Sequence, residues 1–125
     1  MNPLKAFLVE DSPVVSDSLI AALEELAPID VVGVVADERS AVQWMKEHAS
    51  DCDIVITDIF LKSGSGLGVL RAGRQLGQTG MDMVVISNYA TPDMRRKCLE
   101  MGATRVFDKS RDIDDLIAYC SDLAA

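Results

Sequence analysis

The fold is decided by the stretch Asp53-Ile54-Val55-Ile56-Thr57-Asp58. Its run of three β-branched residues is typical of a strand that is buried on both faces. The run ends at Asp58, and the glycine- and serine-rich segment Lys62-Ser63-Gly64-Ser65-Gly66 follows as a loop. Open α/β sheets bind ligands outside the carboxyl ends of their strands, which is where Asp58 is expected to lie. A lone acid in this position is most often a solvated strand end, so its role depends on what other strands bring to the same edge.

Strands and helices alternate on both sides of this stretch. Apolar runs predict further strands at residues 4–9, 31–35, 83–86 and 105–108. Helical spacing of apolar residues predicts helices over residues 13–26, 37–48, 67–76, 92–101 and 113–123, with Gly77 and Gly80 marking the end of the third. Ser12-Pro13 and Thr91-Pro92 each place a capping hydroxyl before a proline, which favours the start of a helix.

Short connections between alternating strands and helices predict an α/β fold with one parallel sheet and helices on both of its faces. The sheet has five strands, and the flavodoxin-like order 2-1-3-4-5 satisfies right-handed crossovers in a three-layer core. Because no linker or repeat interrupts the pattern, we expect one domain over residues 1–125.

Composition narrows the possible functions. The chain has 125 residues, of which 49% are hydrophobic and 5% aromatic, so its core is aliphatic. A net charge of −8 argues against direct binding to nucleic acid. Three cysteines without C-x-x-C spacing predict reduced thiols and argue against a zinc site. Without a signal-peptide pattern or an apolar run of about 18 residues, we expect a cytoplasmic protein with no membrane partner.

Chemistry-bearing residues stand at four of the five predicted strand ends: Glu10-Asp11, Asp58, Ser87 and Lys109. Carboxylates held close together favour a hard divalent cation, and Mg²⁺ binds through few carboxylates plus a phosphate. Ser87 can donate a hydrogen bond to a phosphoryl oxygen, and Lys109 can neutralise another. Asp58 would then be the nucleophile that forms an aspartyl phosphate. Each residue alone can be interpreted as a helix cap, a loop hydroxyl or a solvated charge without any catalytic role. Their joint placement at the strand ends favours phosphoryl chemistry.

Along essentially its whole length, the chain resembles the receiver domain of two-component response regulators. The strand-end residues match the family's acidic pair, phospho-acceptor, switch hydroxyl and lysine: Glu10-Asp11, Asp58, Ser87 and Lys109. Gly66, eight residues after the acceptor, and Gly102-Ala103 before the last strand also match. The resemblance implies that Mg²⁺ is bound by Asp11, Asp58 and the backbone carbonyl of Phe60, while Glu10 acts through water.

Some positions depart from the family's pattern. Lys62 stands where proline is common, Asn88 where alanine or glycine is common, and Ser110 where a second proline is frequent. Val106 occupies the usual place of the switch aromatic residue. Phe107 comes one position later and therefore faces the opposite side of the strand. Coupled rotation of a hydroxyl and an aromatic ring is thus not expected to operate in the usual way.

The resemblance implies a switch that catalyses only its own phosphorylation and dephosphorylation, and no other enzymatic activity. The phosphoryl donor would be a sensor histidine kinase or a histidine phosphotransfer protein. A downstream protein target would bind the surface formed by the fourth helix, the last strand and the last helix. The basic run Arg95-Arg96-Lys97 lies there and is either a solvated face or part of that docking surface. We expect a monomer or a weak dimer.

Other interpretations remain at this point. The chain could be the receiver of a longer regulator, or an interaction module of the same fold that is not phosphorylated. A haloacid-dehalogenase-like phosphatase is disfavoured because Phe60 stands where that family has its second acid. A dinucleotide-binding loop is disfavoured because Val69 and Arg71 replace the third glycine of the two possible fingerprints that begin at Gly64 or Gly66.

Overall fold

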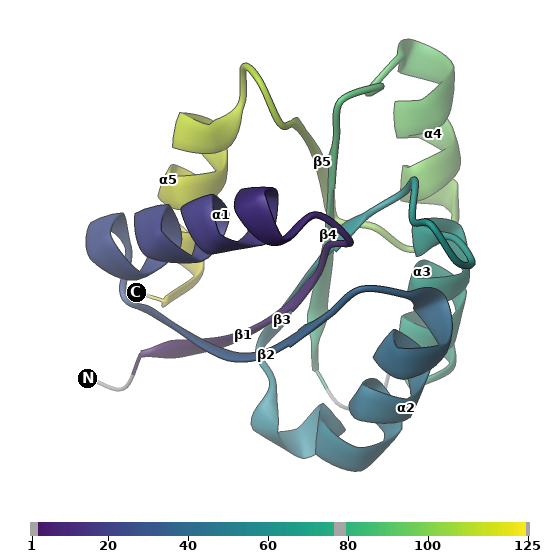
Figure 1. The fold of residues 1–125 in the computed structure, drawn as a ribbon, viewed down its shortest axis with the longest axis horizontal. Coiled ribbons are helices and arrows are strands. Elements are labelled where there is room, and N and C mark those ends of the chain that lie inside the picture. Colours follow the sequence, from purple (N-terminus) through teal and green to yellow (C-terminus); the bar gives the residue numbers. More distant parts are fainter. Residues whose placement is uncertain (1–2, 77–79, 125) are drawn as a thin grey trace.

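A central sheet of five parallel strands is covered by helices on both faces in the computed structural model (Figure 1). The structure describes residues 3–76 and 80–124. The strands are β1 (Leu4–Val9), β2 (Ile29–Val35), β3 (Ile54–Asp58), β4 (Asp82–Ser87) and β5 (Arg105–Asp108). Their order is β2-β1-β3-β4-β5, which confirms the predicted topology.

The helices follow the strands in regular alternation. They are α1 (Pro13–Leu26), α2 (Glu38–His48), α3 (Gly66–Gln75), α4 (Pro92–Glu100) and α5 (Ile113–Ala124), with a 3-10 turn η1 (Ala49–Asp51) after α2. In Figure 1, α1 and α5 cover one face of the sheet, and α2, α3 and α4 cover the other. Both expected caps are present: the hydroxyl of Ser12 accepts from the N–H of Val15, and that of Thr91 from Met94.

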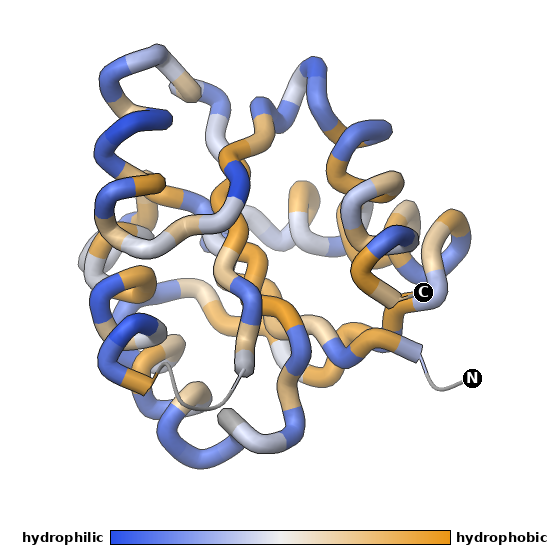
Figure 2. Tube along the Cα trace, turned by 180° about the vertical axis from the view of Figure 1, so that it is seen from behind, coloured by the Kyte–Doolittle hydropathy of each residue, from blue (hydrophilic) through white to orange (hydrophobic). Residues whose placement is uncertain are grey.

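Two apolar clusters fill the space between the layers. Side chains of the strands alternate between them, so that Ile54 and Ile56 pack toward α1 and α5 whereas Val55 packs toward α2 and α3. All five residues of β3 are buried, as the β-branched run predicts. Figure 2 shows the hydrophobic residues concentrated along the strands at the centre of the molecule.

Several boundaries differ from the sequence-based expectation. β2 begins at Ile29 rather than Val31 because Ile29 pairs in register with Leu4. β3 begins at Ile54, and the carboxylate of the preceding Asp53 accepts the backbone N–H of Lys5 at 2.8 Å. α3 ends at Gln75, and the predicted stop at Gly77 lies outside the described residues. Among the helices of residues 3–76 and 80–124, none has the length and apolar character needed to cross a membrane.

Candidate functional site

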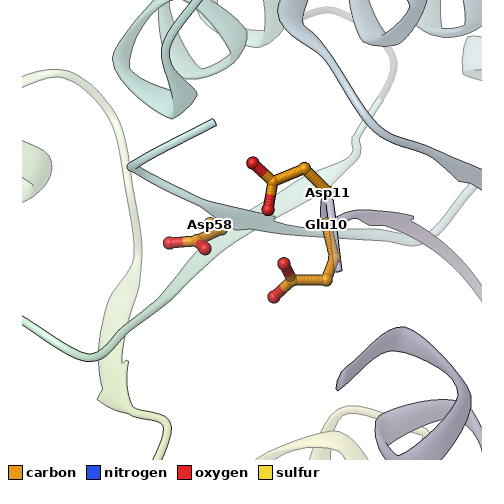
Figure 3. A group of neighbouring side chains, drawn as sticks. All are labelled: Glu10, Asp11 and Asp58. Carbon is orange, nitrogen blue, oxygen red and sulfur yellow. The ribbon is translucent and has the colours of Figure 1, made fainter. Parts of the chain in front are cut away.

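Three acidic side chains meet at the carboxyl edge of the sheet. β1 and β3 are neighbours, with Val9 paired to Thr57, so the residues that follow these positions are brought side by side. Glu10, Asp11 and Asp58 each place a carboxylate oxygen within 4.8 Å of the others (Figure 3). Glu10 and Asp58 are buried, and Asp11 is partly exposed. The structure therefore brings together the acids that the sequence placed at this edge.

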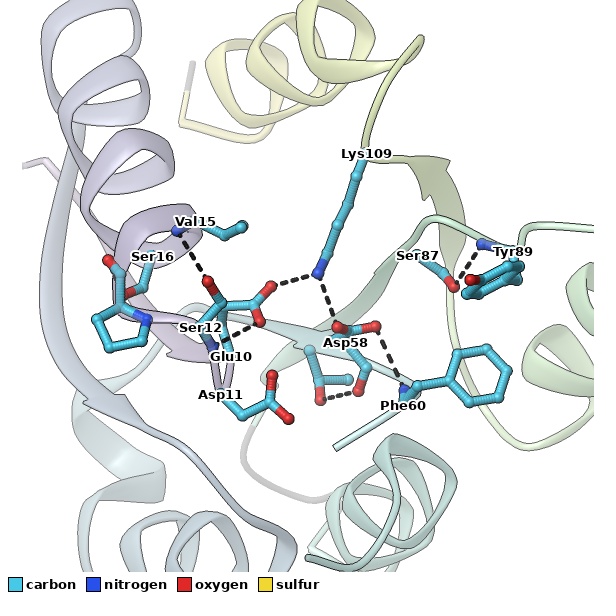
Figure 4. A network of polar contacts seen from close by, with 12 residues as sticks. Glu10, Asp11, Ser12, Val15, Ser16, Asp58, Phe60, Ser87, Tyr89 and Lys109 are labelled. Carbon is cyan, nitrogen blue, oxygen red and sulfur yellow. Dashed lines mark hydrogen bonds and ion pairs between the residues drawn. The ribbon is translucent and has the colours of Figure 1, made fainter. Parts of the chain in front are cut away.

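Lys109 reaches into this acidic cluster from the end of β5 (Figure 4). Its Nζ lies 2.7 Å from Oδ2 of Asp58 and also forms an ion pair with Oε1 of Glu10. Burial alone would lower the pKa of Lys109, but hydrogen bonds to Asp58 and Glu10 and the charges of these carboxylates outweigh it and raise the pKa. Lys109 is therefore positively charged at physiological pH, and this charge lies beside the carboxylate of Asp58.

The donor set fits a hard divalent cation. Three carboxylates and one lysine leave a net charge of −2 if all are ionised (−3 + 1), and all the side-chain donors of the acidic cluster are oxygens. Oxygen ligands of this kind suit Mg²⁺. Backbone groups orient two of the acids: Lys62 donates its N–H to Oδ2 of Asp11 at 2.7 Å, and Phe60 donates its N–H to Oδ1 of Asp58 at 3.3 Å.

Two aromatic rings lie beside Asp58. Phe60 and Tyr89 form a perpendicular pair with ring centroids 5.5 Å apart, and both rings are exposed. Together with the acidic cluster and Lys109 they border a cavity of about 250 Å³. Ser87 is fully buried behind Tyr89, and its Oγ accepts the backbone N–H of Tyr89 at 3.1 Å. Because Ser87 is the acceptor in this bond, its hydroxyl proton remains available for donation.

A model of the response regulator receiver domain matches residues 6–121 of the chain. The chain belongs to the response regulator receiver family. This receiver domain is 32% identical over 112 residues to a protein-glutamate methylesterase/protein-glutamine glutaminase of Anaeromyxobacter dehalogenans, a match that covers 88% of the chain and 30% of the relative. It is 23% identical to the fimbriae Z protein of Salmonella typhimurium, covering 93% of the chain and 54% of that protein. The receiver thus spans 30% to 54% of the length of these relatives.

Solved structures show the same fold. The signal receiver domain of NarL from Mycobacterium tuberculosis superimposes with a TM-score of 0.87 at 21% identity, covering 99% of this chain and 98% of that one. A two-component response regulator of the LuxR family from Aurantimonas gives a TM-score of 0.87 at 26% identity, with 98% of this chain and 86% of the other covered. The chain is a receiver domain of two-component systems.

The receiver's basic run does not form one uniform surface. Arg95 is partly buried and donates to the carbonyls of Ala90 and Val106 at 3.0 and 2.8 Å, and to the carboxylate of Asp112 at 3.2 Å. Arg96 pairs with the exposed Asp93 on the same helix, while Lys97 is exposed. Arg95 therefore links the loop after β4 to β5 and to the start of α5 through hydrogen bonds. Within the basic run, only Arg96 and Lys97 are exposed to solvent.

The switch region matches the expected departure from the family. Val106 packs toward the α2, α3 and α4 side, whereas Phe107 faces the opposite side, where its ring lies 5.9 Å from that of Tyr119. Phe107 is only 6% exposed, and together with Val106 and Tyr119 it borders a cavity of about 370 Å³.

Contacts that support the site from outside were not predicted from the sequence. The N–H of Lys62 that orients Asp11 is a backbone group, and backbone donors carry no sequence signal. Glu38, at the start of α2, contacts the loop after β3. The closely spaced glycines Gly64 and Gly68 were a signal of close packing there, since their missing side chains leave room for Glu38.

Proposed function

We propose that Asp58 accepts a phosphoryl group from a phosphohistidine of a sensor kinase or a phosphotransfer protein. One carboxylate oxygen of Asp58 forms a bond to phosphorus, while the bond from phosphorus to the donor nitrogen breaks and its electron pair stays on that nitrogen. The observation that carries this proposal is the 2.7 Å contact between Lys109 Nζ and Asp58 Oδ2 inside a buried acidic cluster. A buried carboxylate with a fixed cation beside it suits phosphoryl transfer, which depends on positioning and charge neutralisation.

Asp11, Asp58 and the backbone carbonyl of Phe60 would hold Mg²⁺, with Glu10 acting through a water molecule. When bound, the ion supplies positive charge to the phosphoryl oxygens. Lys109 holds a second positive charge at the same place, and it can exchange its contact with Asp58 for one with a phosphoryl oxygen. The residues of the site thus divide into oxygen ligands, a nucleophile and a cation.

Phosphorylation would replace one negative charge on Asp58 by about two and add hydrogen-bond acceptors. Ser87 can then donate its hydroxyl proton to a phosphoryl oxygen, because accepting the N–H of Tyr89 leaves that proton available. Movement of the loop after β4 would alter the surface of α4, β5 and α5, because Arg95 connects that loop to Val106 and Asp112. We propose that a downstream protein target binds this surface.

In this proposal the receiver works in the cytoplasm as a monomer or weak dimer, and it catalyses only the gain and loss of its own phosphoryl group. The test is intact-protein mass spectrometry after incubation with acetyl phosphate and Mg²⁺. We expect phosphorylation of the parent and none of Asp58→Asn, whose amide has a similar shape but is not nucleophilic. Lys109→Ala is expected to retain Mg²⁺ binding, since lysine contributes no metal ligand, and to lose the response of the α4–β5–α5 surface.

An unmodified parent that also fails to bind beryllofluoride in the presence of Mg²⁺ would contradict the proposal. The interaction module without phosphorylation would then be the better interpretation. Phosphate incorporated into Asp58→Asn at the level of the parent would show that the acceptor is a different residue.

A further inference from the structure

Glu38 lies against the loop that carries the site, although it is 27 positions away from that loop in the sequence. Its Oε1 accepts the backbone N–H of Ser65 at 2.8 Å, and its own N–H donates to the carbonyl of Ser63 at 3.2 Å. Asp37 fixes the position of Glu38, because the Asp37 carboxylate accepts the N–H of Ser40 at 2.8 Å and so caps the start of α2. The Glu38 side chain is thus anchored on a helix and reaches a loop.

Two glycines make room for this carboxylate. A Cβ added at Gly68 would lie 2.2 Å from Cδ of Glu38, and one added at Gly64 would lie 2.4 Å from its Cβ. Gly64 also has a φ of +79°, a conformation that glycine adopts without strain. The loop sequence is therefore fitted to Glu38, and the spacing of these glycines has a packing reason that is unrelated to nucleotide binding.

Ser65 connects Glu38 to the acceptor site. Its side chain accepts the N–H of Leu67 at 3.0 Å as the N-cap of α3, and its backbone forms an antiparallel bridge with Phe60. Phe60 in turn donates its N–H to Asp58. The carbonyl of Phe60 is the implied backbone ligand for Mg²⁺, so the hydrogen bond from Ser65 to Glu38 is one contact away from the metal ligand and two contacts away from the nucleophile.

We propose that Glu38 is a positioning residue of the receiver: through Ser65 it fixes the backbone of Phe60 and thereby sets the Mg²⁺ affinity of the site. This inference rests on the proposed function, because it concerns the same metal site. It also accounts for Lys62, which stands where the family commonly has a rigid proline. In this chain the loop is held by hydrogen bonds from two sides, to Asp11 through Lys62 and to Glu38 through Ser65.

Titration calorimetry with Mg²⁺ alone, on the full chain, tests the proposal. Glu38→Gln keeps an acceptor oxygen for the Ser65 N–H, so its Kd should stay within about twofold of the parent. Glu38→Asp keeps the charge but is too short to reach Ser65, and Glu38→Ala has no acceptor. Both should bind Mg²⁺ about tenfold more weakly, the typical loss when a group that orients a metal ligand is removed. Glu47→Ala, on the exposed side of the same helix, is the matched control and should bind like the parent.

The comparison separates positioning from stability and from charge. Melting temperatures without Mg²⁺ show how far each variant is destabilised, and a merely structural role would lower them without changing the Kd of the folded protein. If Glu38→Ala does not fold, the contrast between Glu38→Gln and Glu38→Asp decides. An unchanged Kd in Glu38→Asp, or a Kd in Glu38→Gln as weak as in Glu38→Asp, would overturn the positioning role while leaving the proposed function intact. A parent that does not bind Mg²⁺ would overturn both.

Discussion

Gly66 offers a sharp test of how closely the backbone at Asp58 is packed. An added Cβ would lie 2.0 Å from the carbonyl oxygen of Asp58 and 2.7 Å from Cα of Ile59, both of which are backbone atoms. Real Cβ atoms essentially never come closer than 3.0 Å, so Gly66→Ala requires a displacement of at least 1.0 Å (3.0 − 2.0). Flexible side chains could absorb such a shift, but the end of a central strand cannot do so without distorting the sheet.

This displacement has a predictable cost. Overpacking at a rigid site costs about 3 kcal/mol, the upper end of the usual range. At this chain length each kcal/mol lowers Tm by roughly 4 °C, so we expect a loss of roughly 12 °C. The same shift is larger than the tolerance of the 2.7 Å hydrogen bond between Asp58 and Lys109, so phosphorylation should fall together with stability.

Urea unfolding and thermal melting measure the effect, with Gly102→Ala as the matched control. Gly102 has a φ of +112°, but an added Cβ there would only make ordinary contacts with Arg74, the nearest at 3.8 Å. Its cost is the backbone strain alone, about 1–2 kcal/mol. If Gly66→Ala unfolds at the same urea concentration as Gly102→Ala or above it, the close approach of Gly66 to the end of β3 is refuted.

Three further outcomes are expected. Arg95→Ala should lower the free energy of unfolding by about 2 kcal/mol, since it removes three hydrogen bonds to partly buried acceptors. Arg96→Ala should change the free energy of unfolding by less than about 0.5 kcal/mol. Equal values for the two variants in urea unfolding would contradict the division of the basic run. Phe60→Asn combined with Tyr89→Glu should speed loss of the phosphoryl group about tenfold at constant Mg²⁺, equivalent to about 1.4 kcal/mol, because a polar side chain can orient the attacking water that the two rings exclude. A double variant no faster than the parent would show that the rings do not control access. Burial and the hydrogen bond to the carboxylate of Asp82 raise the pKa of Tyr119 to about 12. The protonated Tyr119 hydroxyl therefore contributes fully to the free energy of unfolding below a pH of about 10, and this contribution is lost as the pH rises toward about 12. Absorbance at 295 nm should show this late transition, and Tyr119→Phe should remove it.

The topology and the composition of the candidate site follow from short-range patterns. Ile54-Val55-Ile56 specifies a buried strand, and parallel strands with short connections bring their carboxyl ends to one edge. The sequence pattern alone is therefore enough to predict that the acids and the lysine at those strand ends lie close together. The pairing of Lys109 with Asp58 shows that this reasoning extends to individual side chains at the site.

Contacts between loops that approach only in the folded chain could not be predicted in this way. The side chain of Glu38 looks like an ordinary first-turn acid of an amphipathic helix, and its contact depends on where α2 meets the loop after β3. Arg95 has the same sequence signature as its basic neighbours, but the turn of α4 directs it toward β5 and α5. The start of β2 is similarly set by pairing with Leu4, which is a tertiary contact.

The three cysteines have a practical consequence. Cys52, Cys98 and Cys120 are all free and buried, and burial raises the pKa of each thiol, to about 11 for Cys52 and about 12 for Cys120. Alkylating reagents react with thiolates, whereas buried thiols that stay neutral do not react. A reagent can therefore modify these cysteines only when the surrounding structure unfolds locally. The rate at which these three cysteines are alkylated thus measures local unfolding, and together they sample both layers of the core. A single cysteine introduced on the surface of α4 could be labelled selectively, because the three native cysteines do not react in the folded protein. Partner binding could then be followed without replacing any native cysteine.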